Sequence, residues 1–390
     1  MQLEALARSG KVSEIPSRLE SWGNPAGEPF RYWRAFALVE GGKYAEARAT
    51  LKEKFAAPEL ALLAARLAAQ LEHDAGDYMA ASAHFAAAAA LITSNDAVRA
   101  ENALAWALSC VSAGEDKGAR EVLAKEGALE AKGSAGDAAR LLAAYVAAKT
   151  GDARDARSLL ERIVSDGGNA AEVPFVQASL TLAEEDWLAG STNTAIAFAS
   201  NAVERASRPE TKALAGFDLG FRELAVPALR TNGIARINAL VREYPDAPGA
   251  EDALVRLADA LLAGGEAEES LKAYDRFLQA YPAAQSRKVH VLEGRGRAFI
   301  ALKRTTEAVG AFARAAQVAT NAEERARCMF RQGDALLAAG RFSEAADAYG
   351  AVRGTNLFSF AQFQMADALS RAGKADLAAR QFETVMDGGS

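Results

Sequence analysis

The stretch Asp252–Pro282, DALVRLADALLAGGEAEESLKAYDRFLQAYP, predicts two short helices joined by a Gly-Gly turn. Apolar residues recur at helical spacing in both halves. They are Leu254, Leu257, Ala258 and Leu261 before the turn, and Leu271, Tyr274, Phe277 and Leu278 after it. Glycine ends a helix at little cost because it adopts the left-handed conformation. A hairpin of this size cannot bury its apolar face alone, so we expect neighbours of the same kind.

Small residues recur along the chain in register with this hairpin. Ser270 stands five positions after the turn glycine Gly265, and the equivalent marker positions follow at intervals of 33–39 residues. The markers are Ala47, Ala81, Ala119, Ala156, Ala195, Gly233, Ser270, Ala308, Ala345 and Ala378. A second small residue precedes each marker by twelve positions, at Ala35, Ala69, Ala107, Ala144, Ala183, Ala258, Gly296, Gly333 and Ala366, and Phe221 breaks the pattern. Small residues at both positions allow two antiparallel helices to cross closely.

The turn glycine is repeated as well. It precedes the marker by five positions in eight repeats, at Gly42, Gly76, Gly114, Gly151, Gly190, Gly265, Gly340 and Gly373. The other two repeats have Ala228 and Lys303 at this position. An alanine-rich helical chain would not produce so many aligned positions by coincidence, so the sequence predicts a tandem array of helical hairpins.

This pattern resembles the tetratricopeptide repeat (TPR), most closely in GGKYAEA (Gly41–Ala47), AGDYMAA (Ala75–Ala81) and AGRFSEA (Ala339–Ala345). The resemblance covers about Glu28 to the C-terminus. The period differs from the usual one of about 34 residues. The large apolar residue usual at the fourth repeat position is replaced by Arg31, Ala65, Ala103, Arg140, Ser179 and Gln362. The resemblance implies an all-α fold, a right-handed superhelical TPR-like solenoid of about ten to eleven hairpins.

Three regions are expected along the chain. Residues 1–27 form an irregular helical pair that caps the array, residues 28–210 form an alanine-rich half, and residues 211–390 form a more regular half. Repeats of the last region end in Tyr-Pro, in EYPDAPGAEDAL and QAYPAAQS. In this feature they resemble TPR proteins of the bacterial cell envelope, such as the TolA-binding periplasmic protein and BamD-type lipoproteins.

Bulk properties narrow the classes of partner and compartment. The formal net charge is −6 and no basic run is present, which argues against nucleic acid as the main partner. No apolar stretch is long enough to cross a membrane, and the N-terminus does not resemble a signal peptide. We expect a cytoplasmic protein or a mature or truncated envelope segment, with a leaning to the periplasm from repeat style. No extra polar helix follows the last repeat, so we expect either a segment of a longer protein or a last face that meets a partner; alternatively, Ala378–Met386 caps itself.

The sequence contains little that could do chemistry. Its three histidines, His73, His84 and His290, have no metal-binding spacing between them. Cys110 and Cys328 lie too many repeats apart for a disulfide and are interpreted as small buried residues. Gly294-Arg295-Gly296 is half of a dinucleotide fingerprint but falls within a helix. We therefore expect no enzyme activity, no metal and no cofactor.

Candidate partner-binding residues come from the first helix of each repeat, which in TPR arrays faces the concave side. Its ninth position reads Phe36, Gln70, Leu108, Tyr145, Glu184, Arg222, Asp259, Arg297, Asp334 and Asp367. This ladder is mostly apolar or neutral in the first half and charged in the second. The predicted groove residues are Tyr32, Phe36, Tyr145, Arg222, Arg256, Asp259, Arg297, Arg331, Asp334 and Asp367.

Alternatives stay open for both halves of the ladder. The aromatic residues Phe30, Tyr32, Trp33 and Phe36 either anchor a partner or pack on the N-terminal pair, and packing is favoured because aromatics at helical spacing usually belong to a core. The charged residues either bind a partner or pair with one another on a solvated face. The ninth position never carries Asn and the fifth never carries Lys, which argues against recognition of chaperone tails.

The predicted function is a non-enzymatic scaffold that holds a partner peptide or helix in the concave groove. One alternative is a structural spacer or oligomerisation element of a larger assembly. Another is the superhelical, non-catalytic part of a longer envelope enzyme. The implied partner is a protein or peptide; self-association is possible, and direct membrane insertion is not expected.

Overall fold

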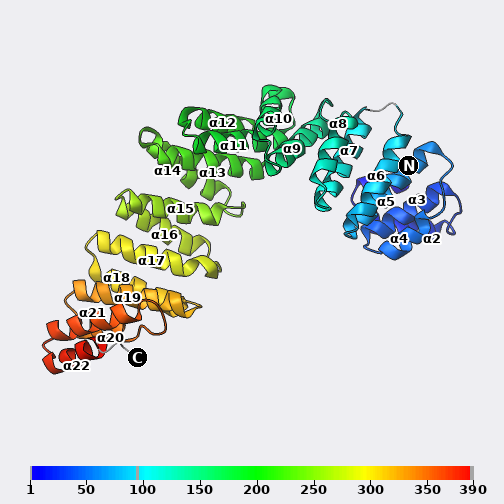
Figure 1. Ribbon diagram of the computed structural model, residues 1–390. Helices are drawn as coiled ribbons and strands as arrows, with labels where there is room; N and C mark the ends of the chain where they lie inside the picture. Colours follow the sequence, from blue (N-terminus) through cyan, green and yellow to red (C-terminus); the bar gives the residue numbers. More distant parts are fainter. Residues whose placement is uncertain (1, 94–95, 387–390) are drawn as a thin grey trace. The chain divides into compact units, whose positions relative to one another are not determined.

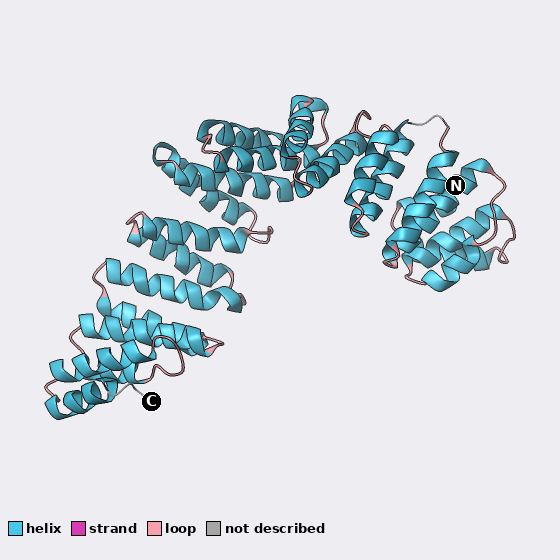
Figure 2. Cartoon of the chain, in the orientation of Figure 1, coloured by secondary structure: helices cyan, strands magenta, loops and turns pink. Residues whose placement is uncertain are grey.

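A computed structural model describes residues 2–93 and 96–386, and these residues form helices joined by turns and loops without any strand (Figure 2). Contacts within the chain divide it into two compact units, unit 1 (Met1–Ala206) and unit 2 (Ser207–Ser390). The all-α fold class is confirmed. The handedness of a superhelix and the boundary predicted at residues 210 and 211 stay predictions.

Unit 1 begins with two short helices and continues with longer antiparallel ones (Figure 1). Its α-helices are α1 (Gln2–Arg8), α2 (Ile15–Ser21), α3 (Glu28–Glu40), α4 (Tyr44–Leu51), α5 (Pro58–Asp74), α6 (Tyr78–Leu91), α7 (Asp96–Ser112), α8 (Asp116–Lys125), α9 (Ser134–Lys149), α10 (Ala153–Ser165), α11 (Glu172–Leu188) and α12 (Thr192–Arg205). Two 3-10 turns, η1 (Val12–Glu14) and η2 (Gly167–Asn169), complete the unit's described helical segments.

Unit 2 continues the alternation of helix and turn. Its α-helices are α13 (Pro209–Ala225), α14 (Arg230–Glu243), α15 (Ala250–Ala263), α16 (Ala267–Ala280), α17 (Gln285–Ala301), α18 (Thr305–Val318), α19 (Ala322–Ala338), α20 (Phe342–Gly350), α21 (Phe358–Arg371) and α22 (Ala375–Met386). The 3-10 turn η3 (Pro227–Leu229) joins α13 to α14.

Consecutive helices pack as the predicted hairpins, from α3 with α4 to α21 with α22. All eight predicted turn glycines have a positive φ, as a left-handed helix end requires. Lys303, which replaces the glycine between α17 and α18, has φ 60° and adopts the same left-handed conformation despite its side chain. Ala228 differs because it lies in η3. The turn geometry is therefore kept even where one glycine is absent.

The small positions mark where the two helices of a hairpin touch. Ala47, Ala81 and Ala308 are fully buried. A Cβ on Gly296 would lie 2.5 Å from the Phe312 ring, and one on Gly333 would lie 2.6 Å from the Tyr349 ring. The small residue and the bulky residue of the partner helix thus fill one another's space, which explains why both recur at a fixed spacing.

Neighbouring repeats stack through their helices. Within each unit, a second helix packs on the first helix of the next repeat, as α4 does on α5 and α16 on α17. First helices also contact one another, as in α7 with α9 and α15 with α17. Buried apolar residues therefore form successive local clusters, such as the cluster that runs from Ala213 to Val291. Each unit is stabilised by nearest-neighbour contacts, as in other solenoids.

The arginines at the fourth repeat position hold loops in place. Arg140 is buried, pairs with buried Asp137 and donates to the carbonyl oxygens of Leu129 (2.8 Å) and Ala131 (3.2 Å). Asp137 in turn accepts from the backbone N–H of Ala171 (2.8 Å), one residue before α11.

A similar pair occurs in the first repeat. Arg31 donates to the carbonyl of Lys54, and Glu28 accepts from the backbone N–H of Ala56 (2.7 Å) and Ala57 (3.2 Å) before α5. These hydrogen bonds replace the apolar packing that a standard repeat has at its fourth position, and in both repeats the acid binds the segment that enters the next first helix.

The N-terminal pair covers the first hairpin. Leu3, Ile15 and Leu19 form a buried cluster against which Phe30, Trp33 and Phe36 pack. Trp22 meets Phe30 edge to face at 6.4 Å between ring centroids. The packing interpretation of the aromatic cluster is therefore confirmed, because apolar side chains of the N-terminal pair contact these rings.

Candidate interaction surface

The first helices of unit 1 present a continuous face. Arg66 of α5 donates to Glu101 of α7 (3.3 Å), and His73 of α5 lies 3.0 Å from the hydroxyl of Ser109 on α7. Helix α9 contacts both α7 and α11. Side chains on the outward stripe of these four helices are therefore neighbours across successive repeats.

Exposed apolar side chains lie on this stripe. Leu63, Leu108, Tyr145 and Leu188 are 41%, 44%, 57% and 77% exposed. Leu63 stands six positions before the buried small residue Ala69 of its helix. Leu108 and Tyr145 each stand one position after theirs, Ala107 and Ala144, and Leu188 stands five positions after Ala183. Since a helix turns about 100° per residue, these offsets differ by at most about 40° around the helix. We call these four side chains the apolar stripe.

In unit 2 the position that follows the small residue is charged in every repeat, although Phe360 of α21, six positions before Ala366, is 52% exposed on the same stripe. Asp259 of α15 accepts from the Tyr274 hydroxyl (2.5 Å), lies 2.8 Å from Nε2 of His290 and 3.4 Å from Nη2 of Arg297. Burial raises the pKa of Asp259, but the bonds from His290 and Tyr274 and the charge of Arg297 outweigh it and lower the pKa overall. Burial and the Asp259 carboxylate together raise the pKa of Tyr274. The carboxylate links α15 to α17.

An equivalent carboxylate lies two repeats later. Asp334 accepts from the Tyr349 hydroxyl (2.7 Å), the same fifteen residues apart as Asp259 and Tyr274, and Arg331 lies 3.9 Å away. Here burial outweighs both partners and raises the pKa of Asp334. On α21, Asp367 pairs with Arg371 at 2.9 Å. These charges are thus largely engaged with groups of the same unit.

Two residues of the predicted groove are not accessible. Tyr32 is buried, with its ring 5.3 Å from that of Trp33 and 6.4 Å from that of Phe36. Arg222 is buried and donates to Asp218 of its own helix at 2.7 and 3.0 Å. Their assignment to an exposed surface is corrected accordingly, because packing and an ion pair occupy these side chains. The Phe36 side chain packs against the N-terminal pair.

Arg256 has a partner that the sequence pattern did not indicate. Its guanidinium lies 3.8 Å from the centroid of the Phe221 ring. Phe221 is the residue that breaks the small-residue pattern, and this cation–π contact gives the large side chain a place. Asp259, three residues later, is bonded instead to Tyr274, His290 and Arg297.

The described residues contain no group of three or more side chains suited to hold a metal ion. The two cysteines, Cys110 and Cys328, are buried and free. Burial raises the pKa of the Cys328 thiol to about 12. Within the described ranges, every helix is too short or too polar to span a membrane.

Comparisons with known proteins agree with the hairpin geometry. The tetratricopeptide repeat family model matches residues 252–284, which cover all but the first two residues of α15, all of α16 and the turn that follows. No curated protein matches the sequence.

Solved structures that match include a tetratricopeptide repeat protein from Parabacteroides merdae, with 13% identity, TM-score 0.41, 74% of this chain and 99% of that one covered. The apo form of the quorum sensor NprR from B. thuringiensis has 11% identity and TM-score 0.44, with 81% and 95% covered. The human IFIT1 dimer with PPP-AAAA has 15% identity and TM-score 0.39, with 100% and 89% covered.

Similarities at this level carry no inference about function, and the resemblance to envelope proteins stays a prediction. The matched repeat, together with the same hairpin and turn geometry in the repeats around it, identifies the chain as a TPR-like repeat protein.

Proposed function

We propose that this chain is a non-enzymatic interaction scaffold that binds an apolar segment of a partner protein on the first-helix face of unit 1. The observation that carries the proposal is the apolar stripe, Leu63, Leu108, Tyr145 and Leu188. Exposed single apolar residues are ordinary, but a row of them on one face of adjacent helices marks an interaction site.

The two units differ in what they leave for a partner. In unit 2 the stripe carries carboxylates and guanidinium groups that already bond to one another, as Asp259 does with Arg297 and Asp367 with Arg371. Exposed pairs of this kind contribute little to affinity because they are screened by water and salt. Burial of the unit 1 stripe would be favourable by the hydrophobic effect, at about 25 cal/mol per Å².

The occupant that fits is a peptide or helix with apolar side chains at regular spacing. Tyr145 is the expected anchor, since tyrosine offers a large contact area at low conformational cost and is enriched among residues that dominate binding. The groove candidates Arg256, Arg297, Arg331 and Asp334 of unit 2 are proposed as a separate surface that selects its own partner by charge.

The test is selection of binding peptides from a random library, followed by affinity measurement with variants. Tyr145→Asp and Leu108→Asp should each weaken binding about tenfold or more. Met79→Asp is the matched control, because Met79 is 65% exposed but lies on the second helix α6. Peptides that bind Leu108→Asp/Tyr145→Asp as tightly as the wild type would contradict the proposal.

Charge reversal separates the two surfaces. If the substitutions in the apolar stripe leave peptide binding unchanged but Arg297→Glu/Arg331→Glu abolishes it, the charged face of unit 2 is the binding site instead. If no peptide is selected and light scattering shows self-association, the spacer or oligomerisation alternative is supported. Circular dichroism must show unchanged helicity in each variant.

A further inference from the structure

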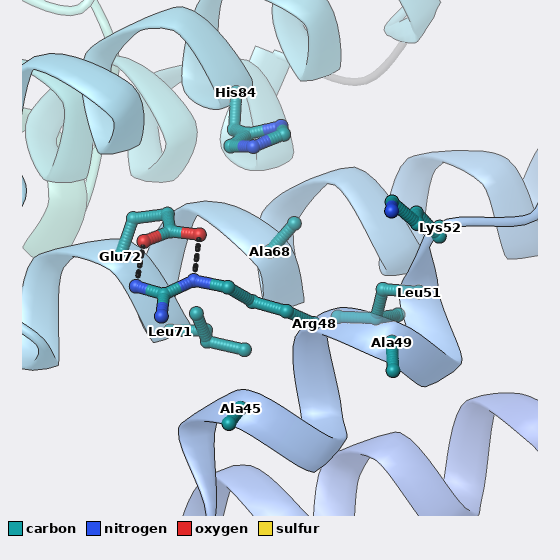
Figure 3. A pocket seen from close by; sticks show the side chains of 9 residues that line it. All are labelled: Ala45, Arg48, Ala49, Leu51, Lys52, Ala68, Leu71, Glu72 and His84. Atoms are coloured by element: carbon teal, nitrogen blue, oxygen red, sulfur yellow. Dashed lines mark hydrogen bonds and ion pairs between the residues drawn. The ribbon is translucent and has the colours of Figure 1, made fainter.

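A pocket lies in unit 1 between two adjacent repeats. It has a volume of about 510 Å³ and is bounded by α4, α5 and α6 (Figure 3). Its lining residues are Ala45, Arg48, Ala49, Leu51, Lys52, Ala68, Leu71, Glu72 and His84. Pockets that bind small molecules have volumes of about 300–1,000 Å³ and mainly apolar walls with a few polar groups.

The acid that lines the pocket is already neutralised. Arg48 donates to both oxygens of Glu72, through Nε at 2.8 Å and Nη2 at 2.5 Å. The Glu72 side chain is only 11% exposed, whereas that of Arg48 is 47% exposed. This hydrogen bond with Glu72 raises the pKa of Arg48. The carboxylate therefore has little capacity left for a ligand, and Arg48 keeps one nitrogen, Nη1, outside the pair (Figure 3).

The accessible polar groups are two cations, Arg48 and Lys52, and the His84 imidazole. Lys52 is exposed, lies at the end of the pocket away from Glu72, and has no ion pair with any residue in the described ranges. The His84 side chain of α6 extends toward the other lining residues (Figure 3). Two cations and one carboxylate give the lining a charge of +1 with His84 neutral. A bound ligand would therefore meet positive charge beside apolar walls.

We propose that this pocket binds a small amphipathic anion, an aliphatic carboxylate whose chain lies against Leu51, Ala68 and Leu71 and whose head group meets Lys52 or the free Arg48 nitrogen. Charge complementarity selects the anion over a cation, because the only carboxylate present is saturated by Arg48. The lining of this site, from α4, α5 and α6, contains none of the four residues of the apolar stripe. A ligand there would contact two adjacent repeats at once, since α4 belongs to the first and α5 and α6 to the second.

The experiment is a titration of the full chain with octanoate and with octylamine, followed by methyl NMR of Leu51 and Leu71. Octanoate should give saturable shifts with a Kd of about 1 mM, as expected for about ten non-hydrogen atoms. Octylamine should bind about tenfold more weakly. Equal affinity for the two ligands, or shifts that grow linearly to about 20 mM octanoate, would overturn the proposal.

Variants locate the site. Lys52→Glu should weaken the binding of octanoate about tenfold. Lys54 is an exposed lysine outside the lining, so Lys54→Glu should keep the affinity for octanoate within about twofold of the wild-type value. Ala68→Trp should abolish the shifts by filling the pocket. Binding that survives Ala68→Trp in a folded protein would place octanoate elsewhere and overturn the assignment. Because Lys52 and Lys54 are both exposed, their variants test the site without disturbing the core.

Discussion

The same substitution should have opposite effects at two helical glycines of unit 2. Gly310 lies in α18, is exposed, and a Cβ built on it meets no atom within 4 Å. Replacing glycine by alanine in an open helix interior is favourable by about 1 kcal/mol. Gly310→Ala should therefore stabilise unit 2 by about that amount, which corresponds to a rise in Tm of about 2–4 °C.

Gly233 lies where α13 and α14 cross. A Cβ there would be 2.5 Å from the carbonyl oxygen of Gly220, 2.5 Å from the amide nitrogen of Leu224 and 3.0 Å from its Cα. These are backbone atoms, so the helices must separate by about 1 Å to reach van der Waals distance. Overpacking of this kind costs about 2–3 kcal/mol. After the gain of about 1 kcal/mol in helix propensity, the net destabilisation is about 1–2 kcal/mol.

The assay is thermal and urea unfolding followed by circular dichroism at 222 nm, with both variants beside the wild type. The propensity gain is common to both, so the difference between Gly310→Ala and Gly233→Ala isolates the steric term of about 2–3 kcal/mol. Repeat arrays need not unfold in two states, so hydrogen exchange of α13 and α14 provides the local readout. A Gly233→Ala protein as stable as the wild type would refute the close-crossing explanation of the small positions.

Three further predictions concern single side chains. Lys303→Gly should stabilise unit 2 by up to about 1 kcal/mol in urea unfolding, because Lys303 adopts φ 60° and a left-handed L-residue is strained; a loss of stability would contradict this. Arg140→Met should destabilise unit 1 by about 3–5 kcal/mol, because it leaves buried Asp137 without its cation. Arg162→Met breaks the exposed pair with Glu130 and should cost only about 0–1 kcal/mol. Equal effects of the two variants on the free energy of unfolding would refute the role of burial. Cys328 should not react with a thiol reagent in the folded protein at pH 8, since its pKa is raised to about 12 and the thiolate needed for attack is scarce, but it should react in urea.

Much of the fold could be predicted from the sequence because its determinants are local. The turn glycines end helices through their own backbone freedom, and eight of them have the positive φ that this requires. The small and bulky positions of a hairpin lie within one repeat, so their spacing alone pairs Gly296 with Phe312 and Gly333 with Tyr349. The N-terminal cap could also be predicted, because Leu3 and Leu19 are apolar and can be buried only against another apolar surface. In the structure they pack against Phe30 and Trp33.

The candidate surfaces depended on packing between repeats, which no local pattern encodes. Position nine is equivalent in every repeat, yet Arg222 is buried in an ion pair with Asp218 while Tyr145 is 57% exposed. Leu63 and Leu188 are neighbours of the stripe residues Leu108 and Tyr145 because side-chain hydrogen bonds join α5 to α7 and because α9 contacts both α7 and α11.

By itself, the sequence determined that this chain forms TPR-like hairpins, because helix periodicity, turn glycines and small residues act over a few residues. The tertiary structure decided which side chains a partner can reach. In the folded chain, Arg256 stacks on the Phe221 ring, Asp259 pairs with His290 and Arg297, and Arg48 neutralises Glu72. Accessibility and charge balance arise from distances between helices of different repeats, and those distances are set only when the repeats stack.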